Sequence, residues 1–301
     1  MANCVQCGRK LPGLTFGKKL CQWCMQHEAA KRGEIAEDAR QPVVAAPWIR
    51  RRESSISLTQ ILFGANVAVF LAMALASGAV IDFPGRTMLA LGANYGPYTL
   101  TGQYWRLFTY MFLHQGLVHI AFNMWCLWDL GALAESLYGR RSFAAIYLIT
   151  GVAGGIASVG WNPGVFTVGA SGAIFGLAGA LLASFYLGEF SLPSVAIRGT
   201  VTSLAFFIVI NILFGAGLNI FGGGSFAVDN AAHIGGLVSG LIMGALIARI
   251  APHRDAPARR FAVIAAVAML VLISGLVVIQ WRGALFRVEP VLGLLNWFGI
   301  R

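Results

Sequence analysis

Seven long apolar stretches constrain this chain more than any other feature. They cover about 57–81, 116–133, 142–159, 170–187, 199–220, 231–248 and 261–280. Each is close to the roughly 20 residues that a helix needs to cross the hydrocarbon of a bilayer. Only 11% of the residues are charged, whereas a soluble domain carries about 25%. The sequence therefore predicts an all-α polytopic membrane protein with seven membrane-spanning helices.

Basic residues indicate how these helices are oriented. Lys and Arg collect in the loops on cytoplasmic sides of membrane proteins. Here they precede the first, third, fifth and seventh apolar segments, at Arg50–Arg52, Arg140, Arg141, Arg198, Arg249, Arg254, Arg259 and Arg260. The long first loop, about 82–115, is the exception, with Arg86 and Arg106. We expect a cytoplasmic N-terminus and an external C-terminus. The same bias explains the net charge of +10, and no stacking or groove-reading pattern suggests a nucleic-acid partner.

Four polar side chains lie at the heads of apolar segments. Ser171 begins the fourth segment and His233 the sixth, while His119 and Asn123 are one turn apart in the second. These segments all run inward from the outer side in the predicted topology, so the four residues share one depth. Strongly polar groups in a bilayer are costly and mark functional sites. A serine beside a histidine further suggests a nucleophile with its base.

Small residues repeat at four-residue spacing on the fourth and sixth segments. The two series are Gly172, Gly176 and Ala180, and Gly236, Gly240 and Gly244. Such spacing lets two helices pack closely in lipid, which would bring Ser171 within hydrogen-bond reach of His233. The unpaired N–H groups of a helix start, together with His119 and Asn123, are candidate donors to an oxyanion.

Other functions fit parts of this pattern. Each polar residue alone is explained by helix packing or a proton relay. A transporter would place Ser171, His233 and Asp229 along a solute path, but the inverted repeats and broken helices typical of that class are not evident. A membrane zinc protease is excluded, because no His-Glu-x-x-His occurs and the paired cysteines lie outside the apolar segments.

The motifs resemble those of the rhomboid intramembrane serine proteases. They are Trp105-Arg106, His114 to Asn123, Gly131-x3-Glu135 with Gly139-Arg140, Gly169 to Gly172, and Ala232-His233-x2-Gly236-x3-Gly240. The resemblance covers about 57–250 and includes six segments in order. The seventh segment resembles the family variant that has one extra C-terminal helix.

This resemblance implies a specific enzyme. Ser171 and His233 would form a catalytic dyad without a third carboxylate, and His119 and Asn123 would stabilise the oxyanion. Substrates would be transmembrane helices of other membrane proteins, cut near their outer ends, in a bacterial inner or plasma membrane. A catalytically dead relative that only binds helices is the alternative, although such relatives usually lack the serine or the histidine. Asp229 is interpreted as a loop residue with a minor chance of orienting the site.

Four cysteines near the N-terminus have the spacing of a zinc site. Cys4-x2-Cys7 and Cys21-x2-Cys24 suit tetrahedral structural zinc, and unligated thiols are the alternative. So short a segment cannot build its own core, so the metal would supply the folding energy. The segment resembles a zinc ribbon, for which we expect a role in stability, regulation or docking of a cytoplasmic partner. No cofactor is expected for catalysis.

These patterns together predict four parts of the chain. They are a zinc-ribbon-like module at 1–28, a linker at 29–55, a six-helix rhomboid core at 56–250, and a loop, seventh helix and tail at 251–301.

Overall fold

The computed structural model divides the chain into two compact units, Met1–Ser54 and Ser55–Arg301. The structure describes residues 4–6, 24, 56–188, 190, 194–221, 228–251 and 257–297. In the first unit, Cys4 and Cys24 are described and buried, whereas Cys7 and Cys21 lie outside the described residues. The second unit contains all four polar residues of the candidate site.

All the regular secondary structure in the described residues of the second unit is helical, and loops connect the helices. These helices are α2 (Leu58–Ser77), α3 (Gly85–Leu91), α4 (Gly96–Thr99), α5 (Arg106–Thr109), η3 (Tyr110–Phe112), α6 (Leu117–Cys126), η4 (Leu127–Gly131), α7 (Ala132–Tyr138), α8 (Arg140–Trp161), α9 (Ser171–Tyr186), α10 (Ser194–Phe221), α11 (Asn230–Ile250) and α12 (Pro257–Trp297). The one β-type contact in this described part is an isolated antiparallel bridge between Asn94 and Thr167. All seven predicted segments are therefore helical.

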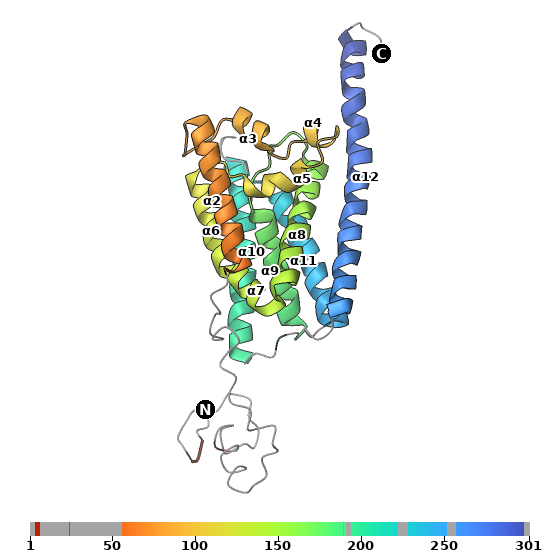
Figure 1. Ribbon diagram of the computed structural model, residues 1–301. Coiled ribbons are helices and arrows are strands. Elements are labelled where there is room, and N and C mark those ends of the chain that lie inside the picture. Colours follow the sequence, from red (N-terminus) through yellow and green to blue (C-terminus); the bar gives the residue numbers. More distant parts are fainter. Residues whose placement is uncertain are drawn as a thin grey trace. The chain divides into compact units, whose positions relative to one another are not determined.

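Within the described residues, six spans are long and apolar enough to cross a membrane, as judged by length and composition, and α6, η4 and α7 together form one of them, Leu117–Tyr138. The fourth predicted span, α9, is shorter, with 16 residues. At 1.5 Å per residue it extends about 24 Å, less than the roughly 30 Å of hydrocarbon. Most of its residues are buried, against α8, α10 and α11 among others, and Tyr186 at its last position is exposed. Figure 1 shows α9 in the middle of the bundle. Because neighbouring helices cover most of α9, this helix need not match the bilayer thickness.

The glycine series of α9 and α11 pack against each other as predicted. A Cβ placed at Gly236 would overlap the backbone of Gly172, one at Gly240 that of Gly176, and one at Gly244 that of Ala180. These three pairs succeed one another down the two helices, so the backbones are in contact along the whole repeat. The close packing fixes the register in which Ser171 and His233 approach.

A carboxylate anchors the first span. Glu135 of α7 accepts hydrogen bonds at 2.8 Å from the backbone N–H groups of Leu58 and Thr59, and at 2.7 Å from the Thr59 hydroxyl. The first N–H groups of a helix have no partner within it, so Glu135 satisfies donors that would be costly to leave unpaired. This contact joins α2 to the second span, which contains a π-helical turn at η4.

The first loop folds into short helices at one end of the bundle. Figure 1 shows α3, α4 and α5 near the end where α8 finishes. The buried Arg106 holds this loop together, donating to the carbonyls of Leu89 at 2.8 Å and Ala93 at 2.9 Å and to the side chain of Gln103 at 2.7 Å.

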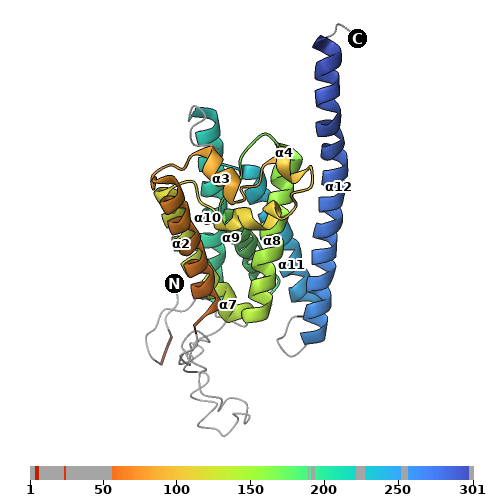
Figure 2. The same cartoon turned by 45° about the horizontal axis from the view of Figure 1, so that its top comes forward.

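The last helix, α12, packs on the outside of the bundle against α8 and α11, and Figure 2 shows it at the edge of the unit. It corresponds to the predicted seventh span. Arg282 ties it to the end of α8 by donating to the carbonyl of Gly160 at 2.9 Å and that of Trp161 at 3.3 Å.

Candidate active site

The structure brings Ser171 and His233 into hydrogen-bonding contact. His233 Nε2 lies 2.8 Å from Ser171 Oγ. Ser171 is the first residue of α9 and is partly exposed, while His233 lies in the first turn of α11 and is buried. A hydroxyl hydrogen-bonded to a histidine ring nitrogen is the arrangement of a nucleophile with its general base.

An aromatic ring holds the histidine in place. Phe175 stacks on the His233 ring, with centroids 4.3 Å apart and planes 8° apart. Phe175 is one turn below Ser171 on the same helix face, so α9 supplies both the hydroxyl and the surface that orients the ring. The sequence analysis missed Phe175, although the spacing of four from Ser171 was a usable signal. His233 Nδ1 has no hydrogen-bond partner among the described residues, so the stack and the serine orient the ring.

His119 lies beside the backbone that leads into Ser171. A Cβ placed at Gly169 would be 2.9 Å from both Cε1 and Nε2 of His119. The backbone N–H of Gln115 points to His119 Nδ1 at 3.4 Å. Since a neutral imidazole has one acceptor and one donor nitrogen, this contact assigns the proton to Nε2. His119 therefore presents a donor toward the start of α9.

Asn123 is buried one turn further along α6. Its Nδ2 donates to the backbone carbonyl of His119 at 2.9 Å. One of its two N–H groups is thus used within the helix, which leaves the second as the candidate donor to an oxyanion. The structure places Asn123 one turn beyond His119 on α6, and its hydrogen bond goes to His119 rather than to Ser171.

The segment before the serine is fixed by a residue that the sequence analysis did not single out. The carbonyl of Tyr110 accepts from the N–H of Gly169 at 2.9 Å, and the Tyr110 hydroxyl donates to the carbonyl of Gly151 at 2.6 Å. Gly169 has φ of +123°, a region that a residue with a Cβ rarely adopts. Glycine is thus needed both for this turn and for the space that His119 occupies.

Comparison with known proteins gives the family. The Rhomboid domain profile matches residues 101–250. The rhomboid protease AarA of Providencia stuartii is 30% identical over 215 residues, covering 66% of this chain and 75% of AarA. The chain belongs to the rhomboid family. The rhomboid protease GluP of Bacillus subtilis is 38% identical over 161 residues, which are 54% of this chain and 29% of GluP. RHOMBOID-like protein 7 of Arabidopsis thaliana is 34% identical over 145 residues, 48% of this chain and 43% of that protein.

This rhomboid is an integral membrane protein, as its six candidate spans and its relatives indicate. The chain spans less than half of GluP and of the Arabidopsis relative, and three quarters of AarA. The matched Rhomboid domain contains Ser171, His233, His119 and Asn123.

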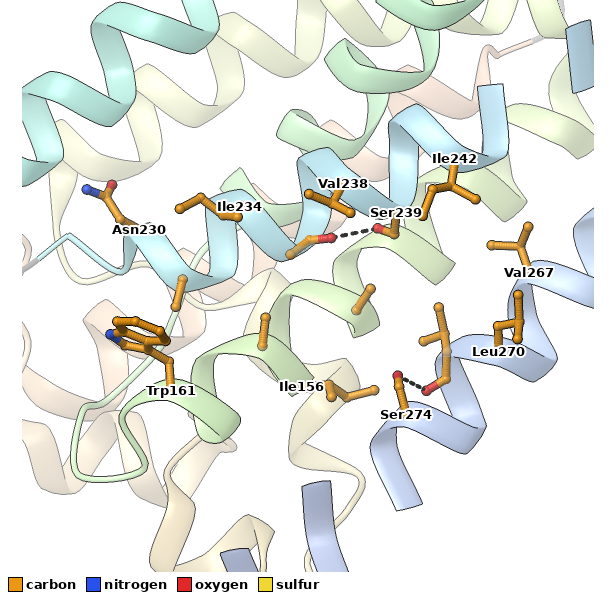
Figure 3. Close-up of a pocket in the computed structure, with 15 residues that line it drawn as sticks. Ile156, Trp161, Asn230, Ile234, Val238, Ser239, Ile242, Val267, Leu270 and Ser274 are labelled. Atoms are coloured by element: carbon orange, nitrogen blue, oxygen red, sulfur yellow. Dashed lines mark hydrogen bonds between the residues drawn. The ribbon is translucent and has the colours of Figure 1, made fainter. Parts of the chain in front are cut away.

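A pocket of about 730 Å³ in this rhomboid lies away from the dyad, between α8, α11 and α12 (Figure 3). Ile234 and Gly235 line it, whereas their neighbour His233 points to α9. The hydroxyl of Ser239 in its wall donates to the carbonyls of Gly235 and Gly236, so it is not available as a nucleophile. The pocket is otherwise mainly apolar and is not part of the candidate active site.

Proposed function

We propose that this rhomboid is an intramembrane serine endopeptidase that cleaves transmembrane helices of other membrane proteins. The 2.8 Å contact between His233 Nε2 and Ser171 Oγ carries the proposal. Ser171 and His233 lie at the starts of two closely packed apolar helices, α9 and α11. This position supports cleavage of a peptide bond within the bilayer. The names of AarA and GluP as rhomboid proteases support the same reaction class.

In the proposed mechanism, neutral His233 accepts the Ser171 proton through Nε2 as Oγ attacks the scissile carbonyl. The negative charge that develops on the carbonyl oxygen is stabilised by the Ser171 N–H, by Nε2–H of His119 and by the amide of Asn123. Protonated His233 then gives its proton to the leaving nitrogen. Water attacks the acyl-enzyme, with His233 again as base, and releases Ser171.

The short α9 supports access of water to this site. We expect this helix, which is shorter than the hydrocarbon is thick, to begin below the membrane surface. Ser171, its first residue, is partly exposed, whereas the residues that follow it, 172–181, are buried. We place this end of the bundle on the outer side, with the N-terminus in the cytoplasm and the C-terminus outside, from the Lys and Arg bias of the loops. Substrate helices would then be cut near their outer ends.

The N-terminal unit forms a second part of the proposal. Four cysteines with this spacing fit a structural zinc site, and the burial of Cys4 and Cys24, with 2% and 1% exposed, supports a closed one. Bound zinc would cross-link the two cysteine pairs and stabilise the fold of this unit. The described residues include only two of the four thiols and show no cluster of three metal-binding side chains. We assign the unit to stability, regulation or binding of a cytoplasmic partner.

The test is cleavage of a library of tagged single-span proteins in membranes, with wild type, Ser171→Ala and His233→Ala compared at equal amounts of folded protein. The proposal expects at least one substrate to be cut by wild type and by neither variant. Cleavage that survives Ser171→Ala would refute the mechanism. If wild type cuts nothing while it binds the same helices, the non-proteolytic alternative is favoured.

A further inference from the structure

A second hydrogen bond joins the segments that lead into the two catalytic helices. Thr167 precedes Ser171 by four residues, and Asp229 precedes His233 by four. Thr167 Oγ1 donates to Asp229 Oδ2 at 2.6 Å. The contact between Ser171 and His233 joins the same two segments at 2.8 Å. The two segments are therefore joined twice, by the contact between Ser171 and His233 and, four residues earlier on each segment, by the bond between Thr167 and Asp229.

Asp229 is fixed to α11 by its other oxygen. It is the N-cap residue of this helix, and its Oδ1 accepts from the backbone N–H of Ala232 at 3.1 Å. A carboxylate is a preferred cap because it satisfies an unpaired N–H and interacts favourably with the helix dipole. The carboxylate that holds Thr167 is thus rigidly connected to the turn that contains His233.

Thr167 is fixed on the opposite side. It is buried, with 3% exposed, and its backbone pairs with Asn94 through hydrogen bonds of 3.0 and 2.9 Å. Its Oγ1 also lies 2.5 Å from Ser158 Oγ. Because Thr167 gives its only hydroxyl proton to Asp229, Ser158 must be the donor in that contact. The chain of hydroxyls runs from Ser158 of α8 through Thr167 to the N-cap of α11.

We propose that Thr167 and Asp229 are positioning residues that set the separation of Ser171 and His233, an inference that rests on the proposed function. The irregular segment 162–170 lies between the end of α8 and the first residue of α9. The bond joins the two segments directly on the side of the dyad opposite to the packing of Gly172 on Gly236. A hydrogen bond to a carboxylate is stronger than one between neutral groups, so it suits a clamp at this point.

The most direct readout is the rate at which a fluorophosphonate probe labels Ser171 in the full chain in detergent. This reaction needs the nucleophile and its base but no substrate helix. Thr167→Val keeps the shape of the side chain and removes its hydroxyl, and we expect labelling to slow by at least about tenfold, since misplacement of reacting groups by 1 Å can cost about a hundredfold. Thr167→Ser, which restores the hydroxyl, should label near the wild-type rate.

A matched control tests whether any lost hydroxyl between these helices has the same effect. Ser184 Oγ donates to the carbonyl of Gly244 at 3.3 Å, which joins α9 to α11 at the end far from Ser171. Ser184→Ala should lower the melting temperature but leave the labelling rate per folded molecule unchanged. In cleavage assays, Thr167→Val should lower kcat with little change in KM.

The partner residue provides an independent check. Asp229→Ala should slow labelling at least as much as Thr167→Val does, because it removes the N-cap bond from Ala232 as well as the bond from Thr167. The double variant should be no slower than Asp229→Ala, because the bond between Thr167 and Asp229 is already lost there. If Thr167→Val does not fold, Asp229→Ser takes its place in the comparison, because serine keeps a side-chain oxygen that can cap α11 and lacks the second oxygen that accepts from Thr167. The proposed positioning role would be refuted if Thr167→Val were labelled at the wild-type rate. It would also be refuted if Ser184→Ala slowed labelling as much as Thr167→Val does. Failure of the proposed function differs from both, since wild type itself would then not be labelled at Ser171.

Discussion

Replacement of Gly236 by alanine should separate Ser171 from His233, the proposed catalytic pair. Gly236 is one turn after His233, on the face that packs against α9. An added Cβ would overlap the carbonyl oxygen of Gly172 and lie 2.8 Å from its carbonyl carbon. Ordinary contact begins at 3.4 Å, so the helices must part by roughly 0.6 Å for the carbon and by more for the oxygen.

The size of the effect follows from this displacement. Ser171 and His233 are 2.8 Å apart, and a separation near 3.6 Å is no longer a hydrogen bond. We expect kcat to fall by about a hundredfold, because a shift near 1 Å has that effect on reacting groups. Overpacking against backbone should also destabilise the protein by about 2 kcal/mol.

The assay is cleavage of a single-span substrate in proteoliposomes, with melting temperature measured in parallel. Gly64→Ala on α2 is the matched control, since a Cβ there meets nothing within 4 Å and should stabilise the helix by roughly 0.5–1 kcal/mol without changing the rate. Gly236→Ala with a wild-type kcat would refute the argument that backbone contact between α9 and α11 sets the geometry of the dyad.

Three further predictions concern other parts of the molecule. His119→Ala should lower kcat by about a hundredfold with little change in KM, as loss of an oxyanion donor does, and Asn123→Ala should have a smaller effect because one of its N–H groups is already bound to the His119 carbonyl; a normal kcat in His119→Ala would remove it from the mechanism. Glu135→Ala should lower the melting temperature, since unpaired buried donors cost about 1–3 kcal/mol each, while kcat per folded molecule stays unchanged; a changed kcat at an unchanged melting temperature would contradict an anchoring role. Purified protein should contain one zinc ion per chain by elemental analysis, and Cys24→Ser should lose it while the dyad still reacts with a fluorophosphonate; metal-free wild type would refute the zinc site.

The sequence was sufficient for the helices and for the contact between Ser171 and His233. Apolar length located six of the seven helices within a few residues, whereas α12 continues to Trp297, well past the predicted end near 280. The shared depth of Ser171 and His233 at the heads of parallel segments predicted their contact. The glycine spacing predicted which faces of α9 and α11 meet, and the structure confirms it at Gly236 and its two successors. These features depend on helix periodicity and on segment direction, which are local properties of a sequence.

The remaining features depend on contacts between distant residues. The helix α9 has only 16 residues, and it is tolerated in the bundle because its neighbours bury most of it. Apolar composition does not reveal this burial. The bond between Thr167 and Asp229 requires the loop before α9 and the cap of α11 to meet, and neither residue belongs to an apolar pattern. Asp229 lies in a loop as the sequence predicts, and the structure shows in addition that it is the N-cap of the helix that contains His233.

The measurement that tests the central claim most directly uses purified protein and one single-span substrate in proteoliposomes, with the product ends identified by mass spectrometry. We predict a single cut within the outer part of the substrate helix, made by wild type and abolished in both Ser171→Ala and His233→Ala. A cut that persists in Ser171→Ala, or that lies only in the substrate segment outside the membrane, would contradict an intramembrane protease with a dyad of Ser171 and His233.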